Sequence, residues 1–250
     1  IDVIVHAAAL KQVPACEYNP IEAVKTNIDG AENIINAAVD SRVKKVIALS
    51  TDKAVNPINL YGATKLVAEK LFVQGNNYSS IDGTKFSCVR YGNVVGSRGS
   101  VVPLFQHQKK NGVVTITDKN MTRFWITLEQ GVRFVIRAIE LMCGGEVFIP
   151  KIPSMKITDL TKAIAPKCKI KTIGIRPGEK LHEVLVSQEE ARNTYESEDM
   201  FVIRPINLFR EPENSLWKKG KLMKDRNSYS SNTNTKWLTI AQLKKIVKTA

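Results

Sequence analysis

One segment of the sequence, residues 44–65, limits the possible folds of this chain more than any other. Its first part, residues 44–49, is a short and mostly apolar run of the kind that forms a buried strand. Asn56 and Pro57 then break the chain, and a helix is predicted to begin near Asn59. Open parallel sheets place their chemistry at the carboxyl ends of such strands, so the residues that follow this strand are the first candidates for a site.

Hydroxyl and ionisable side chains are concentrated directly after the predicted strand. Thr51, Asp52 and Lys53 end it, and Tyr61 and Lys65 stand four residues apart in the helix, so their side chains share one face. A nearby cation favours the phenolate, and we expect Lys65 to lower the pKa of Tyr61 from about 10 toward the working pH of a general base. A Tyr and Lys pair with this spacing also occurs on many solvated helices, so only its position after the strand indicates an active site.

Three strings of the sequence resemble one known family. Residues 50–65, STDKAVNPINLYGATK, resemble the extended short-chain dehydrogenases/reductases and, more closely, the inverting UDP-N-acetylglucosamine 4,6-dehydratases of the pseudaminic acid pathway. Residues 90–98, RYGNVVGSR, and residues 176–183, RPGEKLHE, match the same family. The resemblance implies an α/β fold, a doubly wound, Rossmann-like parallel sheet with a smaller C-terminal substrate lobe. Residues 1–150 would hold the cofactor and the catalytic groups, and residues 151–250 would form most of the substrate lobe, with some interleaving.

The resemblance also implies a role for each of the five polar residues. Hydride passes between C4 of the hexose and NADP, while Tyr61 removes the O4 proton and Lys65 tunes Tyr61 and binds the nicotinamide ribose. Thr51 holds O4, Asp52 protonates the departing C6 hydroxyl, and Lys53 exchanges the C5 proton. Retaining relatives carry Asp-Glu in place of Asp52-Lys53, and a lysine base is consistent with inversion at C5. We expect Lys53 to be poised for this exchange rather than simply paired with Asp52.

Contacts to the cofactor and the substrate follow from the same resemblance. The residues implied to contact NADP are Ala8, Ala9, Lys11, Tyr61, Lys65, Val94, Val95, Gly96, Ser97 and Arg98. Those implied to contact UDP-N-acetylglucosamine are Lys11, Thr51, Asn93, Val101, Arg176 and Glu179. An arginine can clamp a pyrophosphate and a glutamate can accept both ribose hydroxyls, although an ordinary salt bridge in a turn would use the same two residue types. Asn27 is expected to support the helix that carries the tyrosine.

Composition limits the partners and the compartment. The net charge of +13 and the pI near 9.6 favour an anionic partner. Nucleic acid is one alternative, but the basic residues are scattered and no zinc-finger or RNP-like signature appears, whereas a nucleotide sugar and a dinucleotide fit the charge equally well. The four cysteines show no CxxC spacing, which indicates reduced thiols in a cytoplasmic protein and no metal site. No apolar run is long enough for a bilayer span, so we expect no membrane partner.

The N-terminal part raises a separate expectation. Residues 1–6 already have a buried-strand pattern, and no G-x-G-x-x-G turn occurs between a strand and a helix. We therefore expect that the first βα units are missing and that residues 1–250 alone are inactive. Residues 14–20 are expected to be irregular, before a helix that runs from Pro20 to about Ser41. This helix and the one that begins near Asn59 resemble the pair that forms a dimer bundle in the superfamily, which implies a homo-oligomer.

Two alternatives stay open, and both differ from a dehydratase. The chain can be a nucleotide-sugar epimerase of the same superfamily, or it can be a catalytically silent module that binds NADP. Beyond Pro205 the chain becomes polar, through residues 229–234, and the role of this C-terminal tail is not predicted.

Overall fold

A computed structural model of the chain describes residues 1–80, 83–97, 99–206 and 220–248. The chain divides into two units that interleave along the sequence. The first unit contains Ile1–Tyr91, Val132–Lys151 and Val184–Ser228, and the second contains Gly92–Gly131, Ile152–Glu183 and Tyr229–Ala250.

The first unit is built on a seven-stranded sheet with the order β1-β2-β3-β7-β12-β11-β13. These strands are β1 (Val3–His6), β2 (Lys45–Thr51), β3 (Lys85–Tyr91), β7 (Val147–Pro150), β12 (Met200–Ile203), β11 (Thr194–Glu196) and β13 (Lys221–Leu222). The first four strands are parallel, and the other three continue the sheet in antiparallel pairs. Because β2 lies inside the sheet and is covered on both faces, its sequence contains a continuous apolar run, residues 46–49.

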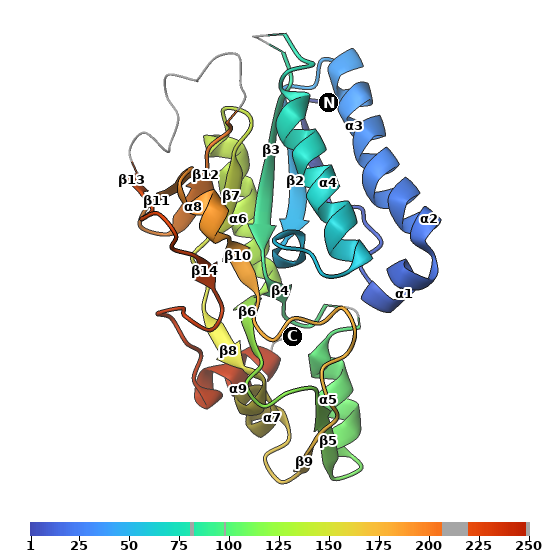
Figure 1. Ribbon diagram of the computed structural model, residues 1–250, viewed down its shortest axis with the longest axis vertical. Helices are drawn as coiled ribbons and strands as arrows, with labels where there is room; N and C mark the ends of the chain where they lie inside the picture. Colours follow the sequence, from blue (N-terminus) through green and yellow to red (C-terminus); the bar gives the residue numbers. More distant parts are fainter. Residues whose placement is uncertain (81–82, 98, 207–219, 249–250) are drawn as a thin grey trace. The chain divides into compact units, whose positions relative to one another are not determined.

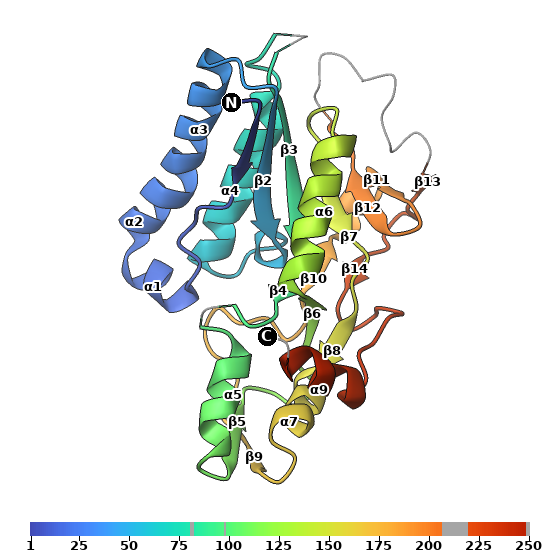
Figure 2. The ribbon, with the colours of Figure 1, turned by 180° about the vertical axis from the view of Figure 1, so that it is seen from behind.

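Helices cover both faces of this sheet, which confirms the predicted doubly wound α/β fold. The helices α3 (Gly30–Asp40) and α4 (Leu60–Gly75) lie on one face (Figure 1), where Phe72 packs against Phe86 with ring centroids 6.4 Å apart. The helix α6 (Leu128–Leu141) lies on the other face (Figure 2), where Phe134 and Val135 belong to one buried cluster with Val89. Both faces of the central strands are therefore dry, as in other parallel sheets.

The segment between β1 and β2 is more helical than predicted. Residues 14–20 were expected to be irregular, but Val13–Tyr18 form the helix α1, because Pro14 stands in its first turn, where a missing N–H costs nothing. The predicted helix from Pro20 is confirmed as α2 (Pro20–Val24), the π-helical turn η1 (Lys25–Asp29) and α3. A π-turn within a helix shifts the side chains that follow it, and such turns are common at functional sites.

The second unit has two small sheets and a separate core. The sheet β4-β6-β8 and the pair β5-β9 carry the helices of this unit. The elements are β4 (Asn93–Val94), α5 (Val101–Lys109), β5 (Val113–Ile116), β6 (Thr122–Ile126), β8 (Ser154–Lys156), α7 (Ile157–Ile164), β9 (Lys169–Thr172), β14 (Tyr229–Ser230) and α9 (Ile240–Lys248). Phe105, Leu160 and Leu243, from three different helices, meet in its core. Thr158 lies inside α7 and not at its N-cap, which is Lys156.

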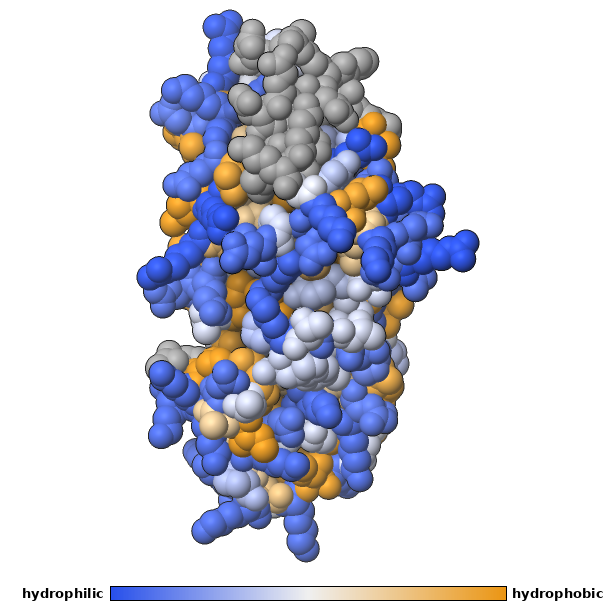
Figure 3. All heavy atoms as spheres, turned by 90° about the vertical axis from the view of Figure 1, so that its left-hand side faces the viewer, coloured by the Kyte–Doolittle hydropathy of each residue, from blue (hydrophilic) through white to orange (hydrophobic). Residues whose placement is uncertain are grey.

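Most of the net positive charge of the chain lies in the second unit. This unit contains 16 lysines and arginines against five aspartates and glutamates, whereas the first unit contains 21 against 19. The surface seen in Figure 3 is mostly hydrophilic and is interrupted by separate hydrophobic patches. Because the fields of charges on one unit add up, the second unit is the part that attracts an anionic ligand most strongly.

Candidate active site

The candidate site in the first unit begins where β2 ends and the 3₁₀ turn η2 (Asp52–Ala54) follows. The hydroxyl of Thr51 donates to Oδ1 of Asp52 over 2.9 Å, and Nζ of Lys53 lies 3.0 Å from the same oxygen. Asp52 is fully buried, and its Oδ2 has no hydrogen-bond partner among the described residues. Lys53 and Asp52 thus form an ion pair, and the expectation that Lys53 is poised for proton exchange stays a prediction.

The helix α4 begins in a position that brings Tyr61 to this turn. Asn59 caps it by accepting a hydrogen bond from the Gly62 N–H over 2.7 Å, and Glu17 of α1 accepts one from the Leu60 N–H over 2.7 Å. A Cβ on Gly62 would lie 2.2 Å from the backbone oxygen of Lys53, so only glycine permits this close approach of helix and turn. The predicted start of the helix near Asn59 is confirmed.

The phenol of Tyr61 lies in the same cluster and hydrogen bonds with the side chain of Thr51. Burial raises the pKa of Tyr61 to about 12, with Lys53 and Thr51 acting to lower it and Asp52 to raise it. The expectation that Lys65 lowers the pKa of Tyr61 is not met, since Lys65 directs its ammonium elsewhere. Its Nζ donates to the carbonyl of Leu49 over 2.7 Å. The cation that acts on the tyrosine is therefore Lys53.

Lys65 is buried, and hydrogen bonds of Asn27 fix the helix around it. Burial lowers the pKa of Lys65, while Cys88 and Glu69 act to raise it. Asn27, which lies in η1, accepts from the Leu10 N–H over 2.8 Å and donates to the Leu10 carbonyl over 3.0 Å and to the Thr64 hydroxyl over 2.9 Å. The π-turn thus lets one amide fasten the segment after β1 to the helix that carries Tyr61 and Lys65, which is the supporting role expected for Asn27.

Sequence reasoning missed a buried ionic network next to these residues. Arg90 at the end of β3 donates to Glu69 through Nε over 3.1 Å and through Nη2 over 2.5 Å, and to Glu190 over 3.0 and 2.8 Å. Ser50, on β2, donates to Glu69 over 2.6 Å, and Arg90 also donates to the carbonyl of Leu185. The network joins the strand before Thr51 to the helix one turn beyond Lys65. The only signal in the sequence was the position of Glu69, four residues after Lys65.

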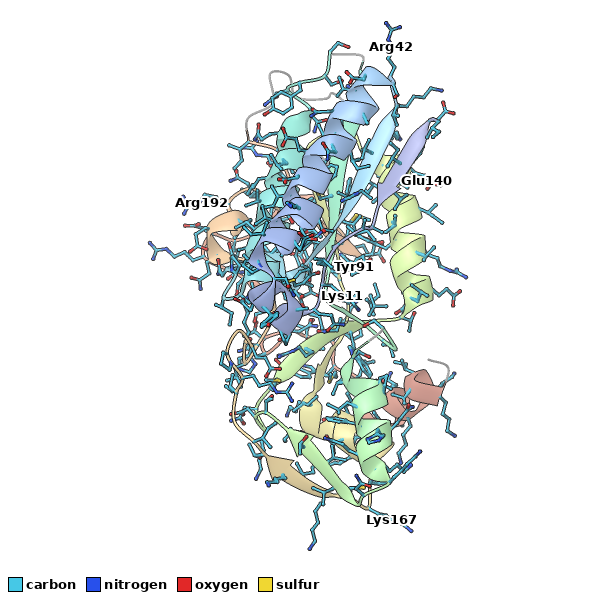
Figure 4. The ribbon with its side chains drawn as sticks, turned by 90° about the vertical axis from the view of Figure 1, so that its right-hand side faces the viewer. Lys11, Arg42, Tyr91, Glu140, Lys167 and Arg192 are labelled. Carbon is cyan, nitrogen blue, oxygen red and sulfur yellow. The ribbon has the colours of Figure 1, made fainter. Side chains whose placement is uncertain are left out.

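The predicted cofactor residues fall in both units. In the first unit, Ala8 and Lys11 are exposed and Ala9 is half-buried, and all three follow β1 in the chain. Lys11 is labelled in Figure 4. His6, which ends β1, is buried against the ring of Phe72 at 5.2 Å, and burial and the charge of Lys65 lower its pKa. The remaining predicted contacts are Val94, Val95, Gly96 and Ser97 in the second unit and Arg98, which lies outside the described residues.

The predicted substrate residues Asn93, Val101, Arg176 and Glu179 all belong to the second unit, whereas Lys11 and Thr51 belong to the first. Asn93 lies in β4 and its buried Oδ1 has no hydrogen-bond partner among the described residues, while Val101 begins α5. Arg176 is exposed and Glu179 is half-buried, and the N–H of Glu179 donates to the carbonyl of Arg176 over 3.1 Å. The Arg176 guanidinium is thus exposed at a turn that a backbone hydrogen bond closes.

The described residues contain neither a candidate metal site nor a helix that could span a membrane. In residues 1–80, 83–97, 99–206 and 220–248, no group of three or more His, Cys, Asp or Glu side chains is arranged to hold a metal ion. In that part of the chain, no helix is both long enough and apolar enough to cross a bilayer.

Comparison with known proteins places this geometry in a family. The family described as "Polysaccharide biosynthesis protein" matches residues 1–205. An inverting UDP-N-acetylglucosamine 4,6-dehydratase of Campylobacter jejuni is 54% identical over 254 residues, which cover 99% of this chain and 76% of the relative. A UDP-glucose 4-epimerase of Rickettsia conorii is 43% identical over 261 residues, which cover 100% of this chain and 74% of the relative.

The chain is also similar to a solved structure over its whole length. The X-ray structure of Pen from Bacillus thuringiensis has a TM-score of 0.86 and 39% sequence identity, and covers 100% of this chain and 76% of its own. These similarities confirm the resemblance that the three strings indicated. With a family match over residues 1–205 and relatives 54% and 43% identical across almost its whole length, the chain belongs to the polysaccharide biosynthesis protein family.

Proposed function

We propose that the protein is a UDP-N-acetylglucosamine 4,6-dehydratase that inverts C5 of the sugar. One observation carries the proposal: Thr51, Asp52, Lys53 and Tyr61 meet at the carboxyl end of β2, with a lysine and not a glutamate beside the aspartate. The relative that is 54% identical bears the name of this activity. The product would be a UDP-2-acetamido-2,6-dideoxy-L-arabino-hexos-4-ulose, a precursor for pseudaminic acid and flagellin glycosylation.

The cofactor in this proposal is a nicotinamide dinucleotide, specifically NADP. The residues present fit such a group, because the small residues Ala8, which is exposed, and Ala9, which is half-buried, follow β1 and leave room for a close approach. Lys11, Tyr61, Lys65 and the segment from Val94 to Arg98 would complete its contacts. When bound, NADP supplies reversible acceptance of hydride.

Tyr61 and Thr51 would handle the proton on O4. The hydrogen bond between their side chains gives a path for this proton, and Tyr61 is the base. Since burial raises the pKa of Tyr61 to about 12, the phenolate must be favoured by cations, and Lys53 already acts in that direction.

Asp52 and Lys53 would form the acid and the base of the elimination. Nζ of Lys53 lies 3.0 Å from Oδ1 of Asp52, so one proton transfer along this hydrogen bond leaves a neutral amine and a neutral carboxylic acid. The neutral amine can then take the C5 proton, and the carboxylic acid can give its proton to the departing C6 hydroxyl, which leaves as water. The ion pair is thus the resting form of an acid and base couple.

The UDP moiety is assigned to the second unit. Arg176 and Glu179 would hold the diphosphate and the uridine ribose, with Asn93 and Val101 beside the sugar, and the excess of basic residues in that unit supports an anionic ligand. A homo-oligomer formed through α3 and α4 and a cytoplasmic location, which agrees with four free cysteines, are parts of the same proposal.

Turnover of UDP-N-acetylglucosamine by the full-length protein in D2O, followed by NMR, tests the proposal. We expect deuterium at C5 and the L-arabino 4-keto sugar from the start of the reaction, and Lys53→Ala should abolish both. The D-xylo product would refute inversion. Formation of the 4-epimer with no loss of water would favour the epimerase named in the Rickettsia relative. Binding of NADP with no change in the sugar would indicate a silent module.

A further inference from the structure

The segment directly after the proposed UDP turn is held by an arginine. In the second unit, Arg123 of β6 donates through Nη2 to the carbonyl of Lys180 over 2.9 Å and through Nη1 to the carbonyls of Leu181 and Thr122 over 3.1 and 2.7 Å. Its Nε also lies 3.6 Å from Oε1 of Glu183. The side chain of Arg123 is only 13% exposed, so these contacts are shielded from water and from competing ions.

A second set of hydrogen bonds joins this segment to the polar C-terminal tail. The hydroxyl of Thr122 lies 2.7 Å from that of Ser231 and 2.8 Å from Nδ1 of His182. Ser231 Oγ accepts from the Glu183 N–H over 2.9 Å, and the Ser231 N–H donates to the Glu183 carbonyl over 2.8 Å. Thr122, Glu183 and Ser231 are 4%, 2% and 0% exposed. Buried polar groups with such partners are expensive to separate, so this junction is rigid.

The other end of the turn is fastened by the sheet of the same unit. β9 pairs with β5 in parallel, and the Ile173 N–H donates to the carbonyl of Ile116 over 2.9 Å. Between the two anchors, Gly174 and Gly178 have φ angles of 90° and 79°, and Arg176 is exposed. The turn is therefore an exposed loop whose two ends are fixed, with glycine at the positions where a side chain would be strained.

We propose that Arg123, Thr122 and Ser231 are positioning residues for the UDP moiety, and that the C-terminal tail from Tyr229 is the element that locks the turn. The inference rests on the proposed function, because the ligand is the UDP assigned to Arg176 and Glu179. A turn whose ends are fixed before the ligand arrives loses less conformational freedom on binding, which favours affinity. The three residues act on UDP through the backbone of residues 180–183 and do not touch it.

Substitution of Arg123 separates geometry from charge. Lysine keeps the positive charge but, with a single nitrogen, cannot reach the separate carbonyls that the planar guanidinium joins. If Arg123 served only as a source of positive potential, Arg123→Lys would retain affinity for UDP. If Arg123 is a positioning residue, the Arg123→Lys and Arg123→Met variants should bind UDP with similarly reduced affinity. Lys162→Met is the matched control, because this basic residue of the same unit is 60% exposed and lies in a loose pair with Asp159.

The test is calorimetric titration of UDP and of NADP into the full-length protein and its variants, together with steady-state kinetics. We expect Arg123→Met and Arg123→Lys to weaken UDP binding about tenfold and Ser231→Ala severalfold, about the scale of a few side chains that must be ordered on binding. KM for the UDP-sugar should rise in parallel, kcat at saturation and NADP affinity should stay near the parent values, and Lys162→Met should change nothing. Hydrogen exchange should accelerate at the amides of residues 176–183 and not across the core.

Other outcomes overturn the inference. A folded Arg123→Met variant that binds UDP as tightly as the parent removes the positioning role, and so does an Arg123→Lys variant with parental affinity. Should Arg123→Met not fold, Arg123→Lys and Ser231→Ala decide the question by the same criterion. A parent that binds NADP but no UDP contradicts the proposed function itself, and the positioning role falls with it.

Discussion

Replacing Arg90 by methionine should destabilise the first unit more than any surface change. Arg90 and Glu69 are each only 1% exposed, and Glu190 is 22% exposed, so two carboxylates depend on one guanidinium in a dry environment. Removing one partner of a buried ion pair costs about 3–5 kcal/mol, because the other charge is left uncompensated. Here the substitution also removes the donor to the Leu185 carbonyl. We therefore expect a loss of about 4 kcal/mol in the free energy of unfolding.

Urea and thermal unfolding of the parent, of Arg90→Met and of a matched control variant measure this loss. For a chain of this size, 1 kcal/mol corresponds to about 2–4 °C, so the Tm should fall by about 10 °C. Arg137→Met is the control, because its pair with Asp199 is 52% and 43% exposed and should contribute less than about 1 kcal/mol.

The triple variant with Glu69→Gln, Arg90→Met and Glu190→Gln should recover part of the stability, since no charge then stays buried. A loss below about 1 kcal/mol in Arg90→Met, or a triple variant less stable than the single one, would refute the reasoning.

Three further predictions concern the same unit. Tyr61→Phe should lower kcat by about two orders of magnitude or more with UDP-sugar affinity retained, which single-turnover kinetics and titration can check. Gly62→Ala should lose activity and about 1–3 kcal/mol of unfolding free energy, because the alanine Cβ would lie 2.2 Å from the Lys53 carbonyl oxygen. Alanine by itself favours a helix, so a variant more stable than the parent would contradict this steric argument. Burial acts to raise the pKa of Glu190, but Arg90 and Ser187 hold this pKa below its ordinary value near 4.5. The stability that the carboxylate contributes is present above that pH and should be lost as the pH falls through the lower pKa of the folded state. Acid titrations of unfolding should show a flatter loss for Glu190→Gln.

Local sequence was sufficient for the elements that position Tyr61. The apolar run before Ser50 predicted β2, and the break at Asn56 followed by Asn59 predicted the start of α4, because periodicity and capping act over a few residues. The same local reasoning failed for α1, where residues 14–20 were expected to be irregular although Pro14 stands in the first turn of a helix. Spacing thus predicted which side chains follow the strand, and the parallel sheet confirmed the fold that the three strings implied.

Only the tertiary structure decided the charge environment of the site residues and the contacts between residues that are distant in the sequence. The pKa of Tyr61 depends on burial and on Lys53, and the pairing of Lys53 with Asp52 depends on how η2 folds under α4, neither of which spacing along the chain can reveal. The Arg90 network and the junction at Ser231 join residues 100 and 109 positions apart, whose partners are fixed by the packing of elements that are distant in sequence. Hydrophobic periodicity contains no information about such pairs, because it reports which face of an element is buried and not what that face meets.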